Sequence, residues 1–220
     1  LFGYTSVTDE SDAAMEPPLV WITNEKDRSP AELVWVPEGA WGNLGGALLN
    51  LSYGTGRIFI VPHEEVDGQW QGAVCELPMP AFATGLMRGR FGSDGALYGC
   101  GMFAWAGNAT TPGGFHRIRR GEAPARMPLT VRAVQGTMQV TFSDPVTDTG
   151  SAIKVWSLKR TKNYGSKHFD ERELKITSVT LSDDRRTVTL AIPDLAPTHC
   201  YELKIGDRIL HGTIHALGRP

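Results

Sequence analysis

Arginine, aromatic and histidine side chains that could bind a polar ligand gather between residues 88 and 119. Arg88 and Arg90 lie two residues apart in an expected strand, so both side chains point to one face of a sheet. Two guanidinium groups on one face could bind a carboxylate-bearing cofactor or a sugar acid through forked hydrogen bonds. The alternative is that they pair with Asp or Glu side chains of a neighbouring unit. Because structural ion pairs outnumber binding sites, the sequence favours that alternative.

Trp105 and Asn108 lie in a segment of turn-forming residues and could together bind a sugar. The indole face would stack on the C–H groups of the sugar while the amide binds its hydroxyl groups. A loop tryptophan could equally fill the space between two packed sheets. The sequence leaves both interpretations open.

His116 is a candidate general base, because an imidazole changes charge near neutral pH. It stands in an expected strand between Phe115 and Arg117, and the sequence offers it no evident carboxylate partner. A strand histidine of this kind is more often structural. The sequence therefore assigns no catalytic residue.

Three histidines near the end of the chain, His199, His211 and His215, could share a face, as the ligands of a metal ion do. No carboxylate array accompanies them, so exposed strand ends are the simpler interpretation. The sequence predicts no metal site.

The three cysteines, Cys75, Cys100 and Cys200, form no Cys-x-x-Cys pair. This spacing excludes a zinc knuckle and a covalent haem attachment motif within the chain. Two alternatives remain for the thiols, a disulfide between Cys75 and Cys100 or buried free thiols, and free thiols agree better with general cysteine behaviour.

Charge and hydropathy limit the classes of partner. The formal net charge of −2 argues against nucleic acid or an anionic membrane surface held through bulk charge. No run reaches the roughly 18 apolar residues of a membrane-spanning helix. Residues 1–124 carry 8 Lys and Arg against 14 Asp and Glu, net −6, whereas residues 125–220 carry 14 against 10, net +4. The sequence therefore predicts two domains of different character.

The first part contains glycine-punctuated β-hairpins. Residues 86–105 predict a strand, a tight turn at 93–95 and a returning strand, with glycines where backbones come close together. Strands are also expected at 19–22, 33–36, 47–52, 57–61 and 70–77, and a further strand at 114–119. About four strands between residues 31 and 77 match the content of one propeller blade.

The second part has a regular alternation of apolar and polar residues. Seven strands are expected, at 129–134, 137–142, 153–158, 176–181, 187–192, 200–205 and 208–214, with turns between them. This density of short strands is typical of an immunoglobulin-like β-sandwich. No segment with helical periodicity is long enough to predict a helix. The expected fold class is all-β.

Several short motifs in a fixed order carry a resemblance to a known kind of protein. The chain resembles the C-terminal part of large bacterial exported proteins with a β-propeller like that of the quinone-dependent sugar dehydrogenases. Such proteins often contain a c-type cytochrome domain and often close with a β-sandwich. The motifs are Ser52-Tyr-Gly-Thr-Gly56, Arg88-Gly-Arg-Phe91, Asp94-Gly-x-Leu-Tyr98, Phe115-His-Arg-Ile-Arg119, Pro128-Leu129, Phe142-Ser-Asp-Pro145 and Asn163-Tyr-Gly-Ser166.

The resemblance implies a partial β-propeller of about two blades at residues 1–124 and a β-sandwich at 125–220. It implies a piece of a longer periplasmic or extracellular protein of the glucose or sorbosone dehydrogenase type, acting in carbohydrate oxidation. Pyrroloquinoline quinone (PQQ) and calcium would be cofactors of that longer protein, and a c-type cytochrome domain its electron acceptor. About four of the six blades and the catalytic base would lie outside this chain, so the chain alone is expected to be inactive.

The alternative function is a non-catalytic module of the same architecture that binds carbohydrate or protein. The Trp105 and Asn108 pair and the missing acid and base motivate this alternative. In either case two blades without their neighbours would expose an unpaired sheet face, which favours association.

Overall fold

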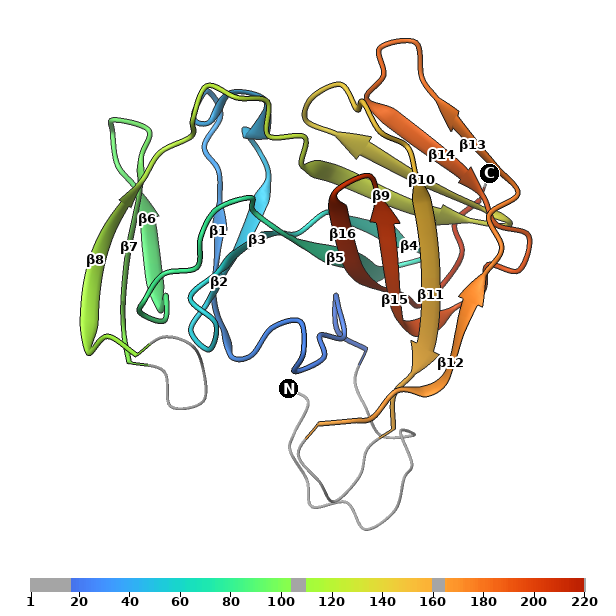
Figure 1. Ribbon diagram of the computed structural model, residues 1–220, viewed down its shortest axis with the longest axis horizontal. Helices are drawn as coiled ribbons and strands as arrows, with labels where there is room; N and C mark the ends of the chain where they lie inside the picture. The colour runs from blue at the N-terminus through green and yellow to red at the C-terminus, as the bar shows by residue number, and fades with distance from the viewer. Residues whose placement is uncertain (1–16, 104–109, 160–164, 220) are drawn as a thin grey trace.

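The protein is all-β in the computed structural model, which describes residues 17–103, 110–159 and 165–219 (Figure 1). These residues form strands in three sheets and one short 3₁₀ helix, η1 (Gly42–Leu44). The predicted fold class is confirmed. Within the described part of the chain there is no helix with the length and apolar character needed to cross a membrane.

The largest sheet has nine strands in the order β1-β2-β3-β5-β16-β15-β11-β12, with β4 paired to β5 beside this path. All of its pairings are antiparallel. The strands are β1 (Pro30–Trp35), β2 (Leu48–Ser52), β3 (Ile58–Ile60), β4 (His63–Val66), β5 (Gln69–Glu76), β11 (Ser151–Ser157), β12 (Phe169–Leu174), β15 (Thr198–Ile205) and β16 (Arg208–Ile214).

One pairing in this sheet joins the two predicted domains. Strand β16 pairs with β5, with Leu210 opposite Cys75 and Gly212 opposite Ala73. Residues from both sides of position 124 therefore share one continuous sheet. The division into two domains at residue 124 stays a prediction. Any two domains divided there would share the sheet that the β5–β16 pairing forms.

The second sheet packs against the C-terminal strands of the first. It has four strands in the order β13-β14-β10-β9, namely β13 (Ser178–Leu181), β14 (Thr187–Ala191), β10 (Thr137–Phe142) and β9 (Pro128–Val134). Val140 and Leu190 of this sheet belong to the same buried core as Leu203 and Ile153 of the large sheet. Two sheets facing each other across a shared core give a sandwich-like arrangement, and the immunoglobulin-like topology remains a prediction.

The third sheet is the predicted hairpin with one further strand. Its order is β6 (Arg88–Phe91), β7 (Leu97–Met102) and β8 (Gly113–Ile118), and Gly95 takes the positive φ of 73° that the turn requires. A β-carbon at Gly101 would overlap the carbonyl oxygen of Gly85, so the expected close backbone approach is present. These strands form the left-hand end of the molecule (Figure 1). The propeller itself remains a prediction.

Two local predictions were wrong. Residues 19–22 form no strand; Leu19 and Ile22 instead pack on Phe59 and Val74 across the face of the large sheet. The apolar side chains of this short run are buried by packing on the face of a sheet, and the run does not itself pair as a strand. Strand β12 was missed because it is a polar edge strand, exposed along most of its length.

Candidate functional site

The two predicted arginines do share one face of the third sheet. Arg88 and Arg90 lie in alternate rows of the β6–β7 pairing, opposite Cys100 and Tyr98. Arg90 forms an ion pair with Glu32 of β1, which is the structural alternative expected from the sequence. Arg88 is exposed and donates to the carbonyl of Met87 at 2.8 Å, and it forms no ion pair with a residue that the structure describes.

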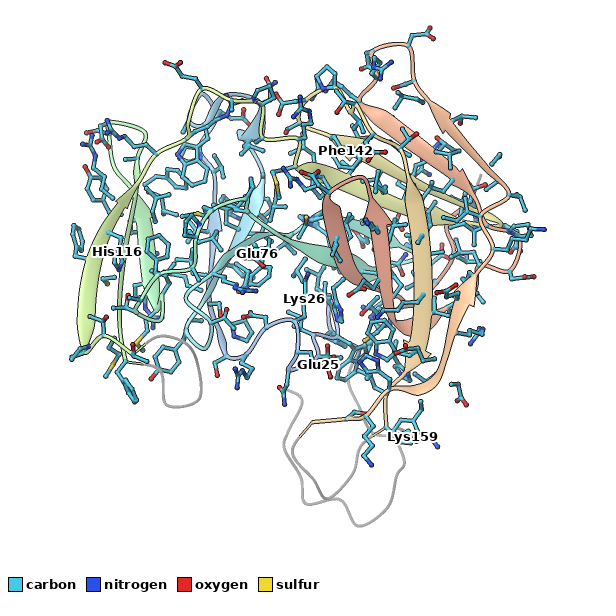
Figure 2. The ribbon with its side chains drawn as sticks, viewed as in Figure 1. Glu25, Lys26, Glu76, His116, Phe142 and Lys159 are labelled. Atoms are coloured by element: carbon cyan, nitrogen blue, oxygen red, sulfur yellow. The ribbon has the colours of Figure 1, made fainter. Side chains whose placement is uncertain are left out.

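His116 lies on β8, in the sheet at the left of the view (Figure 2). Its Nε2 atom is 2.9 Å from the hydroxyl oxygen of Thr84, and its ring lies 4.5 Å from the ring of Phe82. A hydroxyl and an aromatic ring fix this imidazole in place, and none of the described carboxylates pairs with it. The role of general base stays a prediction. Trp105 and Asn108 lie outside the described residues.

The three C-terminal histidines bind backbone groups. His211 is only 1% exposed and donates from Nε2 to the carbonyl of Trp21 at 2.9 Å. The interpretation of His211 as an exposed strand end is wrong, because β16 lies in the middle of the large sheet between β5 and β15. His215 donates to the Pro18 carbonyl at 2.6 Å, and His199 accepts from the Leu158 amide at 3.1 Å. Burial lowers the pKa of His211 to about 4.

No disulfide links the cysteines, and all three are free thiols. Cys75 lies on β5 in the large sheet and Cys100 on β7 in the third sheet, so the alternative of a disulfide between them was wrong, and the free thiols that the sequence favoured are confirmed. Cys75 and Cys200 are buried, while Cys100 is exposed. Desolvation raises the pKa of both buried thiols to about 12, which keeps them protonated and unreactive.

The structure reveals a different site, an array of exposed rings on the large sheet. Trp35 of β1 and Trp70 of β5 are 57% and 47% exposed, and the His63 ring of β4 lies between them. The centroid of the His63 ring is 5.8 Å from that of Trp35 and 5.5 Å from that of Trp70. His63 Nδ1 donates to the Val61 carbonyl at 2.8 Å, which fixes the central ring. We call Trp35, His63 and Trp70 the tryptophan array.

A carboxylate accompanies the array. Glu65 lies directly opposite Trp70 in the β4–β5 pairing and two residues from His63, so all three side chains share one face. Glu65 is exposed. An exposed acceptor beside flat rings can bind hydroxyl groups while the rings cover a C–H surface.

A pocket of about 320 Å³ lies on the same strands. Leu33 and Val61 line it, and each is two residues from a member of the tryptophan array. The segment 18–22 forms its other wall. Asn50 also lines the pocket. Its side-chain amide donates a hydrogen bond to the buried carboxylate of Asp27 at 3.2 Å, which fixes the position of Asn50 in the pocket wall.

The buried carboxylate of Asp27 organises the loop behind the pocket. It accepts hydrogen bonds from the hydroxyls of Ser52 at 2.5 Å and Thr55 at 2.9 Å. Desolvation by burial raises the pKa of Asp27, and these hydrogen bonds oppose that rise. Because the Asp27 carboxylate is buried and accepts hydrogen bonds from neighbouring protein groups, we assign it a structural role, which includes holding Asn50 in position.

The pocket suits binding better than catalysis. Glu32 is the one acidic side chain among its described lining residues, and no histidine, lysine or arginine lines it. Glu32 already accepts hydrogen bonds from the Gly89 amide, at 2.6 Å, and from the Arg90 side chain. Partial burial alone would raise the pKa of Glu32, but these hydrogen bonds outweigh burial and hold the pKa below its ordinary value. A carboxylate so engaged is a poor proton acceptor.

The described residues offer no site for the calcium ion that the resemblance implies. Calcium requires six to eight oxygen ligands, and no group of three or more acidic, histidine or cysteine side chains in the described ranges could hold a metal ion. We therefore place no calcium chemistry on these residues. A comparison of the chain with protein-family models, curated proteins and solved structures found no match.

Proposed function

We propose that this chain binds neutral carbohydrate through the tryptophan array, as the C-terminal part of an exported sugar-dehydrogenase-like protein. The observation that supports this function is the arrangement of the exposed Trp35 and Trp70 rings on either side of the half-buried His63, beside Glu65. The order of motifs in the sequence supports the kinship. In this proposal the chain holds the polymer, and oxidation belongs to other parts of the longer protein.

The physical basis is the match between indole faces and pyranose rings. A pyranose presents an apolar C–H face and a rim of hydroxyl groups, and an indole has a large flat face with a negative quadrupole. The two indoles, on β1 and β5 with the His63 ring between them, would cover two sites along a polymer, and Glu65 and the N–H of each indole would supply hydrogen bonds at the rim. The His63 ring that contacts both indoles is fixed by its hydrogen bond to Val61, which limits the conformational entropy that the array loses when the ligand arrives.

The test is direct binding of cellohexaose, xylohexaose and mannohexaose to the 220-residue chain by isothermal titration calorimetry. We expect at least one of them to bind, and Trp35→Ala or Trp70→Ala to weaken that binding at least about tenfold, the loss typical of a central aromatic contact. Phe115→Ala is the matched control, because this ring is even more exposed than the two tryptophans but lies on the third sheet. Equal affinity of wild type and both tryptophan variants would refute the site.

The oxidation proposal has a separate test on the longer protein. With PQQ and calcium added, that protein is expected to reduce an artificial electron acceptor when given aldoses. Inertness toward a sugar panel under these conditions would refute oxidation and leave the binding proposal standing.

A further inference from the structure

The outward face of the third sheet carries a group of charged and aromatic side chains. The strand pairings place Arg88, Cys100 and Phe115 in one row across β6, β7 and β8. The next row on the same face contains Arg90, Tyr98 and Arg117. We call these two rows the arginine face. The alternate rows point inward, where a β-carbon at Gly89 would meet the side chain of Leu51.

The aromatic rings and charged groups on this face contact one another. The rings of Tyr98 and Phe115 are stacked with centroids 5.8 Å apart and an interplanar angle of 28°. The Arg117 guanidinium lies 5.9 Å from the centre of the Tyr98 ring and pairs with Asp94 at 2.6 Å. Asp94 also accepts from the Tyr98 hydroxyl at 2.9 Å, so three side chains hold one another in place.

The arginine face is positively charged, although residues 1–124 as a whole carry a net negative charge. Residues 1–124 have a net charge of −6 and contain 8 Lys and Arg, of which Arg88, Arg90 and Arg117 lie on the arginine face. Two carboxylates, Glu32 and Asp94, pair with two of these arginines. Three cations against two carboxylates leave a local excess of one, in a region whose average charge is negative. Arg88 is the cation of the three that forms no ion pair with a described carboxylate, although its charge helps to lower the pKa of Glu32.

Folding alone does not account for this face. Phe115 is 72% exposed, which is unfavourable for a large apolar ring, and its neighbour Met102 at the end of β7 is also exposed. The sheet forms one end of the molecule, and no described strand lies beyond β8 (Figure 1). The ion pair between Arg117 and Asp94 is exposed, and exposed ion pairs contribute little to stability. The guanidinium groups therefore remain able to bind a second acidic group.

We infer that the arginine face binds an acidic polysaccharide, one whose sugar residues carry carboxylate groups. The exposed Phe115 ring would stack on a pyranose face, and Arg88 would bind the carboxylate of that or the adjacent sugar residue through a forked pair of hydrogen bonds. An acidic peptide fits less well, because a strand-like peptide would pair with a free sheet edge rather than lie across the face of the sheet. This site is distinct from the tryptophan array, so either can fail without the other.

The exposed Cys100 gives a direct probe, because it lies between Arg88 and Phe115 in the same row. The experiment measures the rate at which iodoacetamide, a neutral reagent, alkylates the native chain with and without polygalacturonate. We expect polygalacturonate to slow alkylation at least about fivefold and the protection to fade as salt is raised. Dextran, a neutral polymer, should leave the rate unchanged.

Two variants and two further polymers decide the outcome. Arg88→Gln and Phe115→Ala should each weaken polygalacturonate binding about tenfold, whereas Arg172→Gln, an exposed arginine on β12, and Trp35→Ala should not. Undiminished binding in the first two variants would overturn the inference. Equal protection of Cys100 by poly-glutamate or by double-stranded DNA would also overturn it, because the face would then recognise charge alone or an acidic protein.

Discussion

The buried histidine of the large sheet makes the stability of the protein depend on pH in a calculable way. The His211 imidazole is enclosed between β5 and β15, next to the ring of Trp156 and opposite Glu202. Desolvation is the largest cause that lowers its pKa, from 6.5 to about 4, and the positive charge of Lys26 adds to the effect. Its hydrogen bond to the Trp21 carbonyl and the charge of Glu202 oppose it.

The sign follows from comparing the folded and unfolded chains. A pKa near 4 in the fold and 6.5 in the unfolded chain means that the unfolded chain binds the proton more readily. The stabilising contribution is therefore complete above pH 6.5 and is lost as the pH falls toward 4. At 1.36 kcal/mol per pKa unit, the loss is about 2 kcal/mol between pH 7 and pH 5 and about 3 kcal/mol by pH 4.

Urea denaturation of the 220-residue chain at pH 7, 6 and 5 measures this loss. His211→Gln keeps an N–H donor but removes the titrating group, so it should abolish most of the decrease between pH 7 and pH 5. His63→Gln is the matched control and should retain the decrease, because His63 is only half-buried. The carboxyl groups with lowered pKa values titrate below this window, which separates their contribution from that of His211.

A second measurement keeps the prediction testable if His211→Gln does not fold. An NMR titration of the wild-type imidazole reports its pKa in the native state directly. A value at or above 6.5, or a free energy of unfolding that does not change between pH 7 and pH 5, would refute the argument from desolvation.

Two further predictions concern the third sheet and the thiols. Gly101→Ala should lower the free energy of unfolding by several kcal/mol, roughly the upper range for single substitutions, because its β-carbon would overlap the Gly85 carbonyl oxygen. Gly113→Ala is the control, because the nearest described atom would be 3.8 Å from its β-carbon. This control should cost less than about 1 kcal/mol in the same urea assay. Native chain should react with Ellman's reagent rapidly at Cys100 alone and at all three cysteines in guanidinium chloride, and rapid reaction of all three in the native state would contradict the burial of the other two.

The sequence predicted turns and most strands because both depend on local chemistry. Asp67 and Gly68 take the two positive φ values, 49° and 84°, that a tight hairpin requires, and Gly136 and Gly206 mark two more turns with φ of 70° and 56°. The alternation in residues 125–220 recovered seven of the eight strands that the structure describes there and failed only at β12. That strand exposes polar side chains on both faces, so it carries no alternation to detect.

Long-range features could not be predicted in the same way. The β5–β16 pairing joins residues about 140 positions apart, and no local signal specifies which strand pairs with which. The change in composition near residue 124 pointed to two domains, while hydrogen bonding builds one sheet across that position. The segment 19–22 was mistaken for a strand because its apolar residues fit a sheet surface as well as a sheet interior.

The tryptophan array escaped sequence analysis for a related reason. Trp35 stands in the run Leu33-Val-Trp-Val36, which looks like a strand buried on both faces, yet Leu33 and Trp35 are exposed while Val34 and Val36 are buried. The alternation was present but hidden, because both faces carry apolar residues. The signal that could have found the site is the pairing of Trp70 with Glu65 across the Asp67-Gly68 turn, which places a ring beside a carboxylate.

Carbohydrate binding by the tryptophan array is tested most directly by ¹⁹F NMR of the chain labelled with 5-fluorotryptophan. Assignment uses single substitutions, and the ligand is the hexasaccharide that binds in calorimetry. We predict that the signals of Trp35 and Trp70 shift as ligand is added, while those of the buried Trp41 and Trp156 stay in place. Saturable binding that leaves the Trp35 and Trp70 signals unmoved would contradict the account.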